Sequence, residues 1–313
     1  LYLLVYCRAE KLRLFQRQFG NYAYDLQGSD EMTDISQLLK RHGIQANKSL
    51  GQNFLHKTDI IENIAKNAAG SDCVLEIGAG PGVLSKHLCG SFKKVVTIEI
   101  DRSLEPVTRE VLEGCKNHTM VYADFLKINL NDIINKYLNL PLVTVVGNLP
   151  YNITGQIITK LIKNHALFDK AVIMIQKEAA QKLCAAPSQD GYRAISVLTQ
   201  YFTNVTPLFD VTPDCFIPAP HVTSSVILMK FKESLPLAAI HEGEFISFIH
   251  KIFCQRRKLI TSVFQTPCEK DKLRRILNNL ELSEKTRGEQ LDHSQLSEIF
   301  RLLYMNKNEI LGN

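Results

Sequence analysis

Between residues 73 and 231, short apolar runs rich in Val and Ile alternate with segments in which apolar residues recur at helical spacing. The apolar runs predict strands at 73–78, 94–100, 118–124, 142–148, 171–176, 204–211 and 222–231. Helices are predicted between the first five of these strands, including 83–88, 103–112 and 156–163. Apolar strands separated by helices indicate a parallel sheet covered on both faces, which is an α/β fold.

The pattern changes towards the C-terminus. A short proline-rich segment joins the last two predicted strands, which favours an antiparallel hairpin at the edge of the sheet. From about residue 240 the apolar positions follow a helical period only, which predicts a small all-helical domain at 240–313. The preceding domain, which contains the sheet, is expected to span 32–235.

The first 31 residues stand apart from both domains. They contain neither the long apolar core nor the small-residue cleavage site of a secretory signal. Met32 is followed by the pattern of a helix start, with Thr33 or Asp34 as its cap. We therefore interpret residues 1–31 as an extension that folding and activity do not require.

Composition sets further limits on function. The formal net charge is +5, and the segment 251–258, KIFCQRRK, carries four positive charges and no acidic residue. No run of about 18 apolar residues predicts a membrane-spanning helix. The eight cysteines form no CxxC pair, and no Cys/His cluster has metal-ligand spacing. We expect no metal site and the reduced cysteines of a cytoplasmic protein.

The first candidate site follows the first predicted strand, in the segment EIGAGPG at 76–82. Gly78 and Gly80 allow the backbone to approach a ligand closely at the carboxyl end of the sheet. Glu99 ends the second strand and can accept both hydroxyls of a ribose, while Asp124 ends the third and can accept from an adenine amino group. Taken singly, these residues also fit a tight turn and solvated acids. Together they describe a nucleoside pocket.

The ligand of this pocket is expected to be an adenosine without phosphates. The glycine spacing differs from the dinucleotide fingerprint, and Pro81 removes an amide donor that a pyrophosphate would use. This points to S-adenosylmethionine, whose sulfonium is already a good leaving group. The protein then needs mainly to align a nucleophile with the methyl carbon.

A second candidate site, NLPY, ends the fourth predicted strand and opens into the same cleft. An exocyclic base amine is a poor nucleophile because its lone pair is delocalised into the ring. The Asn148 side-chain oxygen and the Leu149 carbonyl can bind its two hydrogens, and Tyr151 can stack on the base. A base from a nucleic acid must be flipped or unpaired to reach such a pocket. A single Asn-x-Pro also fits a plain turn with a partly buried tyrosine, which does not explain this location.

The ordered set of motifs resembles the KsgA family of rRNA adenine dimethyltransferases, in its bacterial branch. The segments that carry the resemblance are KSLGQNFL (48–55), EIGAGPG (76–82), TIEID (97–101), AD (123–124), GNLPYNI (147–153), IQKEAAQKL (175–183), FIPAPHVTSSV (216–226) and FCQRRK (253–258). The chain departs from the family pattern at Arg193, where glycine is frequent, and after Lys258, where Thr-Leu is usual.

This resemblance implies a class I, Rossmann-like methyltransferase domain with S-adenosylmethionine as cofactor, followed by a helical domain that contacts RNA. It implies cofactor contacts from Asn53, Leu55, Gly78, Gly80, Glu99, Asp124 and Asn148. It also implies that Asn148, Leu149 and Tyr151 hold the target amine, and that Phe216 stacks on the other face of the flipped adenine. From the residues alone, Phe216 fits the hydrophobic core equally well.

The resemblance further implies a substrate: two adjacent adenosines in the 3′-terminal hairpin loop of 16S rRNA, dimethylated on N6 within an immature 30S particle. Arg256, Arg257 and Lys258 would contact RNA phosphates, which gives positioning without sequence choice. A basic quartet on a helix also fits a solvated face. Two alternatives remain, an Erm-type 23S rRNA methyltransferase and a non-catalytic RNA-binding assembly factor. We expect a monomer.

Overall fold

The structure is a computed structural model that describes residues 35–139 and 142–305. The predicted extension at 1–31 and the predicted cap at Thr33 or Asp34 lie outside the described residues. The described chain forms two compact units: the first holds the chain up to residue 177 together with 206–233, and the second holds 178–205 together with the chain from residue 234. None of the helices in the described ranges is long and apolar enough to cross a membrane.

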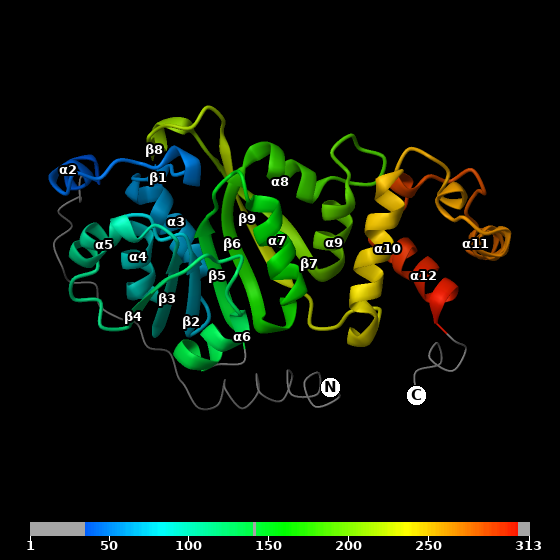
Figure 1. Cartoon of the computed structure of the whole chain (residues 1–313), viewed down its shortest axis with the longest axis horizontal. Coiled ribbons are helices and arrows are strands. Elements are labelled where there is room, and N and C mark those ends of the chain that lie inside the picture. Colours follow the sequence, from blue (N-terminus) through cyan, green and yellow to red (C-terminus); the bar gives the residue numbers. More distant parts are fainter. Residues whose placement is uncertain (1–34, 140–141, 306–313) are drawn as a thin grey trace. The chain divides into compact units, whose positions relative to one another are not determined.

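The first unit is built on a seven-stranded sheet in the order β4-β3-β2-β5-β6-β9-β7 (Figure 1). The strands are β2 (Cys73–Ile77), β3 (Lys94–Glu99), β4 (His118–Tyr122), β5 (Val143–Asn148), β6 (Phe168–Gln176), β7 (Thr203–Val211) and β9 (Ser224–Phe231). Strands β2 to β6 pair in parallel, and β9 runs antiparallel to β6. All seven predicted strands are confirmed. β7 is the edge neighbour of β9, as the predicted hairpin requires.

The strand order reverses between β2 and β5, which lie side by side although β3 and β4 separate them in sequence. In open α/β sheets, ligands bind outside the carboxyl ends of the strands at such a reversal. A separate two-stranded ribbon pairs β1 (Phe54–Leu55) with β8 (Phe216–Ile217) in antiparallel register. Two residues are too few to show an alternating pattern, so the sequence does not reveal this ribbon.

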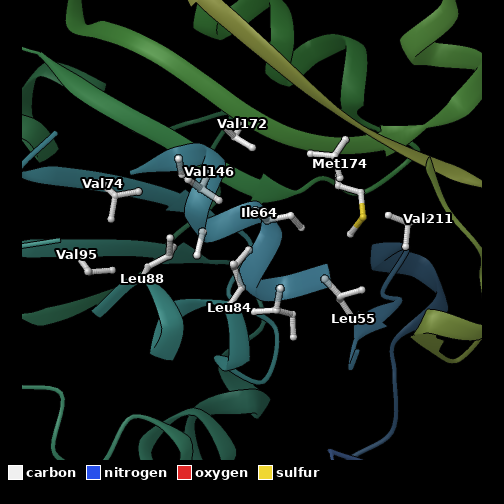
Figure 2. Close-up of a cluster of buried hydrophobic side chains, with 14 of the residues drawn as sticks. Leu55, Ile64, Val74, Leu84, Leu88, Val95, Val146, Val172, Met174 and Val211 are labelled. Carbon is white, nitrogen blue, oxygen red and sulfur yellow. The ribbon is translucent and has the colours of Figure 1, made fainter. Parts of the chain in front are cut away.

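Helices before and between the strands complete the first unit. They are α2 (Ile35–Arg41), α3 (Thr58–Ala68), α4 (Val83–Ser91), α5 (Glu105–Val111), α6 (Leu130–Ile133) and α7 (Thr154–Lys163). Ile64 of α3 and Leu88 of α4 pack into one buried cluster with valines of β2, β3, β5 and β6 (Figure 2). Leu55 and Leu84 belong both to this cluster and to the lining of a cavity, so the core supports the cavity from one side.

The second unit is helical apart from the first residues of β7. Its helices are α9 (Ala194–Phe202), α10 (Glu242–Cys254), α11 (Pro267–Asn279) and α12 (His293–Tyr304), together with most of α8 (Lys177–Cys184). The fully buried ring of Tyr201 in α9 lies 4.5 Å from that of Phe245 in α10, centroid to centroid. This division differs from the predicted cut near residue 235, because burial of α9 against α10 places 178–205 with the C-terminal helices.

Candidate active site

A cavity lies at the carboxyl ends of the four strands β2, β3, β4 and β5. Its lining includes nine of the residues proposed from sequence: Asn53, Leu55, Gly78, Gly80, Glu99, Asp124, Asn148, Leu149 and Tyr151. All of them belong to the first unit. The motifs that lie far apart in the sequence therefore converge because parallel strands finish at one edge of the sheet.

The glycine-rich turn is held tightly between two neighbours. Gly80 has a φ of +53°, a conformation that side-chain-bearing residues rarely adopt. A Cβ at this position would lie 3.0 Å from Cδ1 of Phe54. The Gly80 amide donates a 3.0 Å hydrogen bond to Oε2 of Glu99. A glycine here thus allows the 50–55 segment to lie directly on the turn.

Glu99 is 5% exposed, and backbone amides fix its carboxylate at both oxygens. Oε2 accepts from Gly80, and Oε1 accepts a 2.8 Å hydrogen bond from the amide of Asp101. Burial raises the pKa of Glu99, and these backbone hydrogen bonds oppose the rise. Each carboxylate oxygen can accept more than one hydrogen bond, so acceptor capacity remains for two hydroxyl groups. Two acceptor oxygens fixed in this way fit the two hydroxyl groups of the ribose of S-adenosylmethionine.

Gln52 links the segment over the turn to the end of β3. Its Nε2 donates to Oδ2 of Asp101 at 2.7 Å, and its Oε1 accepts from the amide of Asn47 at 2.7 Å. Gln52 also lines the cavity, beside Asn53. It was not among the residues proposed from sequence, although it lies within the QNFL motif, because its partner Asp101 is remote along the chain.

The NLPY turn presents acceptors to the cavity. Nδ2 of Asn148 donates to the Asn53 carbonyl at 2.9 Å, and its Oδ1 accepts no hydrogen bond from any residue in 35–139 or 142–305. The Leu149 amide donates to the Met174 carbonyl at 3.0 Å. Leu149 lines the cavity, although the residue as a whole is only 1% exposed.

The ring of Tyr151 is half-buried and is held by its hydroxyl. The Tyr151 Oη lies 2.7 Å from Oγ of Ser224, at the start of β9. Burial raises the pKa of Tyr151, so the phenol stays protonated at neutral pH. A ring fixed at its far end and lining the cavity is suited to stacking on a planar ligand.

Phe216 does not join this group. It is 3% exposed, is paired with Leu55 across the β1–β8 ribbon, and packs in the same apolar cluster as Leu55. It is not among the residues that line the cavity. In this structure Phe216 therefore takes the core position, and its stacking on a base stays a prediction.

The three basic residues of the QRRK segment also differ from one another. They follow α10 in a turn rather than on a helix. Arg256 donates to Oε2 of Glu289 at 2.6 Å, and the two side chains are 22% and 17% exposed. Arg257 and Lys258 are exposed. Arg256 therefore has a carboxylate partner within the second unit, whereas its two neighbours are exposed. Contact of these residues with RNA stays a prediction.

Glu76 is a buried acid outside the set proposed from sequence, although a carboxylate inside an apolar strand is itself a signal. Its Oε2 accepts from Ser85 at 2.5 Å and from Thr97 at 3.1 Å. Its Oε1 has no partner among the described residues. Burial raises the pKa of Glu76 to about 7.

This shift predicts a pH-dependent stability. Below the usual Glu pKa, near 4.5, the folded and unfolded states both hold the proton, so Glu76 adds no pH dependence to stability there. As pH rises towards 7, only the unfolded state ionises freely, so stability falls by up to about 3 kcal/mol. Glu76→Gln should remove this loss. In denaturant unfolding from pH 5 to 8, Glu76→Gln should gain stability relative to the native chain; a constant difference would contradict the assignment.

Comparisons with known proteins agree with this geometry. The family model described as "Ribosomal RNA adenine dimethylase" matches residues 43–304. A protein of Mycoplasma mobile named "Ribosomal RNA small subunit methyltransferase A" is 36% identical over 83% of this chain and 98% of its own length. A protein of the same name from Natranaerobius thermophilus is 33% identical over 87% and 96%.

Solved structures give the same result. A dimethyladenosine transferase from Plasmodium falciparum superposes with a TM-score of 0.65 at 25% identity, covering 79% of this chain and 95% of its own. The 23S rRNA methyltransferase ErmE superposes with a TM-score of 0.63 at 24% identity, covering 80% and 99%. The second likeness is one of fold.

Proposed function

Because this chain belongs to the ribosomal RNA adenine dimethylase family, we propose that it dimethylates N6 of two adjacent adenosines in the 3′-terminal hairpin loop of 16S rRNA. The chain is an rRNA adenine dimethyltransferase that uses S-adenosylmethionine. The observation that carries the proposal is the NLPY turn, which meets the nucleoside-binding acids Glu99 and Asp124 in one cavity. The names of the bacterial relatives support the small subunit as the target.

The donor side of the site holds the cofactor by its adenosine. Glu99 accepts from the ribose hydroxyls, and Asp124 accepts from the adenine amine. Gly78, Gly80, Asn53 and Leu55 close around it through the glycine turn and the segment that Gln52 attaches to Asp101. When bound, the cofactor supplies a methyl group already activated by its sulfonium.

The acceptor side makes the target amine a nucleophile. Oδ1 of Asn148 and the Leu149 carbonyl accept its two N–H groups, which draws the nitrogen towards a tetrahedral geometry. Tyr151 stacks on the base and fixes the direction of the lone pair. After one transfer a single N–H remains, and it needs one acceptor only, so the same turn can serve the second methylation.

No buried base is required to complete each transfer. A methylated exocyclic amine is strongly acidic while it carries the positive charge, because losing the proton restores conjugation with the ring. The proton can therefore pass to water. This site then catalyses the reaction mainly by positioning the reactants. Holding two reactants in the right orientation can lower the activation barrier by about 7–11 kcal/mol.

The exposed basic residues should contact RNA phosphates. Replacing Arg257 and Lys258 together with Ala should weaken binding to small-subunit particles and reduce the slope of log affinity against log salt by about one to two. Arg256→Met should instead lower the thermal midpoint of unfolding, because it leaves the partly buried Glu289 without its cation. Equal salt slopes for all three proteins would contradict the assignment.

The proposed function is tested by mass spectrometry of rRNA after incubation with S-adenosylmethionine. We expect two dimethyladenosines in the 3′ hairpin of undermethylated 30S particles. We take these particles to be the target, and we expect the chain to act on them in the cytoplasm as a monomer. Naked large-subunit rRNA serves as the parallel substrate. Methylation of large-subunit rRNA alone would establish the Erm-type alternative, and methylation of neither would favour the assembly-factor alternative.

A further inference from the structure

Lys160 in α7 is a partly buried cation that the catalytic proposal does not use. Its Nζ donates to the Phe125 carbonyl at 2.6 Å and to the Ile128 carbonyl at 2.5 Å. The same nitrogen lies 5.2 Å from the centroid of the Phe125 ring. Desolvation lowers the pKa of Lys160, and the nearby Asp124 carboxylate opposes this shift. The ammonium therefore closes the loop that follows β4.

That loop carries the residue proposed to recognise the cofactor's adenine. Oδ1 of Asp124 accepts from the Leu126 amide at 2.9 Å, and its carbonyl accepts from the Ile128 amide at 3.2 Å. Asp124 and Phe125 both line the cavity. These local bonds shape the loop, but within the described residues only Lys160 joins its Phe125 and Ile128 carbonyls to a helix.

Helix α7 is attached to the acceptor side of the site. It begins at Thr154, whose Oγ1 donates to the Pro150 carbonyl of the NLPY turn at 2.9 Å. Ile157, one turn before Lys160, lines the cavity. The start of α7 thus contacts the turn that is proposed to receive the base, and the last turns of the same helix contact the loop that is proposed to receive the cofactor.

We propose that Lys160 is a positioning residue that sets the adenine selectivity of the cofactor site by holding the 124–128 loop against α7. This inference rests on the proposed role of Asp124. An ammonium bound to two carbonyls forms charge-assisted hydrogen bonds, which are roughly twice as strong as neutral ones. Without it, the two carbonyls lose their donor and Asp124 loses its fixed distance from the adenine amine.

The test is calorimetric binding of two product analogues, S-adenosylhomocysteine and S-inosylhomocysteine, which differ in having an amine or an oxygen at purine position 6. Lys160→Met should weaken the affinity for the adenosyl compound by about 10-fold to 100-fold and change the affinity for the inosyl compound by less than about threefold. Asp124→Asn should also weaken binding of the adenosyl compound, whereas its amide can donate to the inosyl oxygen, so the inosyl affinity should stay unchanged or rise. The double variant should bind the adenosyl compound no more weakly than Asp124→Asn alone, because both changes remove the same contact with the adenine amine.

Matched variants separate positioning from general damage. Lys163→Met removes an exposed lysine from the same helix and should leave both affinities unchanged. Lys160→Arg keeps the charge but changes the donor geometry, and serves if the Met variant fails to fold; its selectivity should be intermediate. Equal weakening of both analogues, or additive effects in the double variant, would overturn the proposal. If Asp124→Asn left the preference for the adenosyl over the inosyl compound unchanged, the adenine contact assigned to Asp124 would be refuted, and the role assigned to Lys160 would fail with it.

Discussion

Replacing Asn148 with Ala should lower the rate of methyl transfer by about two to three orders of magnitude, while rRNA binding stays close to that of the native chain. The variant loses Oδ1, one of two acceptors for the target amine, and removing a single preorganised group from a polar catalytic site has effects of this size. It also loses the bond from Nδ2 to the Asn53 carbonyl. Single-turnover kinetics with saturating cofactor, and filter binding of the 30S particle, measure the two quantities separately.

Asn63→Ala is the matched control, because Asn63 is an exposed amide on α3 and does not line the cavity. It should retain the native rate. If Asn148→Ala transferred methyl groups at more than about a tenth of the native rate, the role of this side chain as an acceptor would be refuted. If its rRNA binding fell in parallel with its rate, the effect would be one of substrate binding instead.

Gly147→Ala should destabilise the first unit by about 3 kcal/mol, at the upper end of what overpacking usually costs. A Cβ at residue 147 would lie 2.7 Å from the Ile77 carbonyl oxygen and 3.0 Å from Cδ2 of Leu149. The Ile77 oxygen belongs to the backbone of the neighbouring central strand and cannot turn aside as a side chain can. Separation of β2 from β5 would also move the glycine turn and the NLPY turn apart, so cofactor affinity should fall as well.

Gly155→Ala provides the contrast, because nothing lies within 4 Å of a Cβ at that position in α7. Alanine is the better helix former, so this variant should gain a few tenths to about 1 kcal/mol. Urea unfolding of both variants at one pH measures the difference. A native-like stability for Gly147→Ala would show that β2 and β5 can separate at little cost.

The strands could be predicted because each is a β-branched run long enough to be distinguished from a helix. The convergence of Gly80, Glu99 and Asp124 in one cavity could also be predicted, since each ends or follows a predicted strand and parallel strands finish at one edge. Their contacts with the cofactor stay a prediction. The β1–β8 ribbon could not be predicted, because each of its strands has only two residues and the two strands are separated by most of the first unit's sequence.

The remaining differences depend on partners remote in sequence. Nothing near Arg256 indicates that Glu289 will bind it, and nothing near Tyr201 indicates that Phe245 will bury it. Phe216 follows the same rule, because its burial depends on Leu55. Lys160 resembles any solvated lysine on an amphipathic helix until the carbonyls of the 124–128 loop are placed beside it.

The interruption of the first unit by residues 178–205 affects how the chain can fold while it is being translated. When residue 177 leaves the ribosome, β6 is still an open edge, since its outer neighbour β9 has not yet been made. An open edge can pair with another chain. The methyltransferase fold therefore cannot close as an N-terminal domain during synthesis, and must wait until the segment that returns to the sheet at 206–233 has emerged.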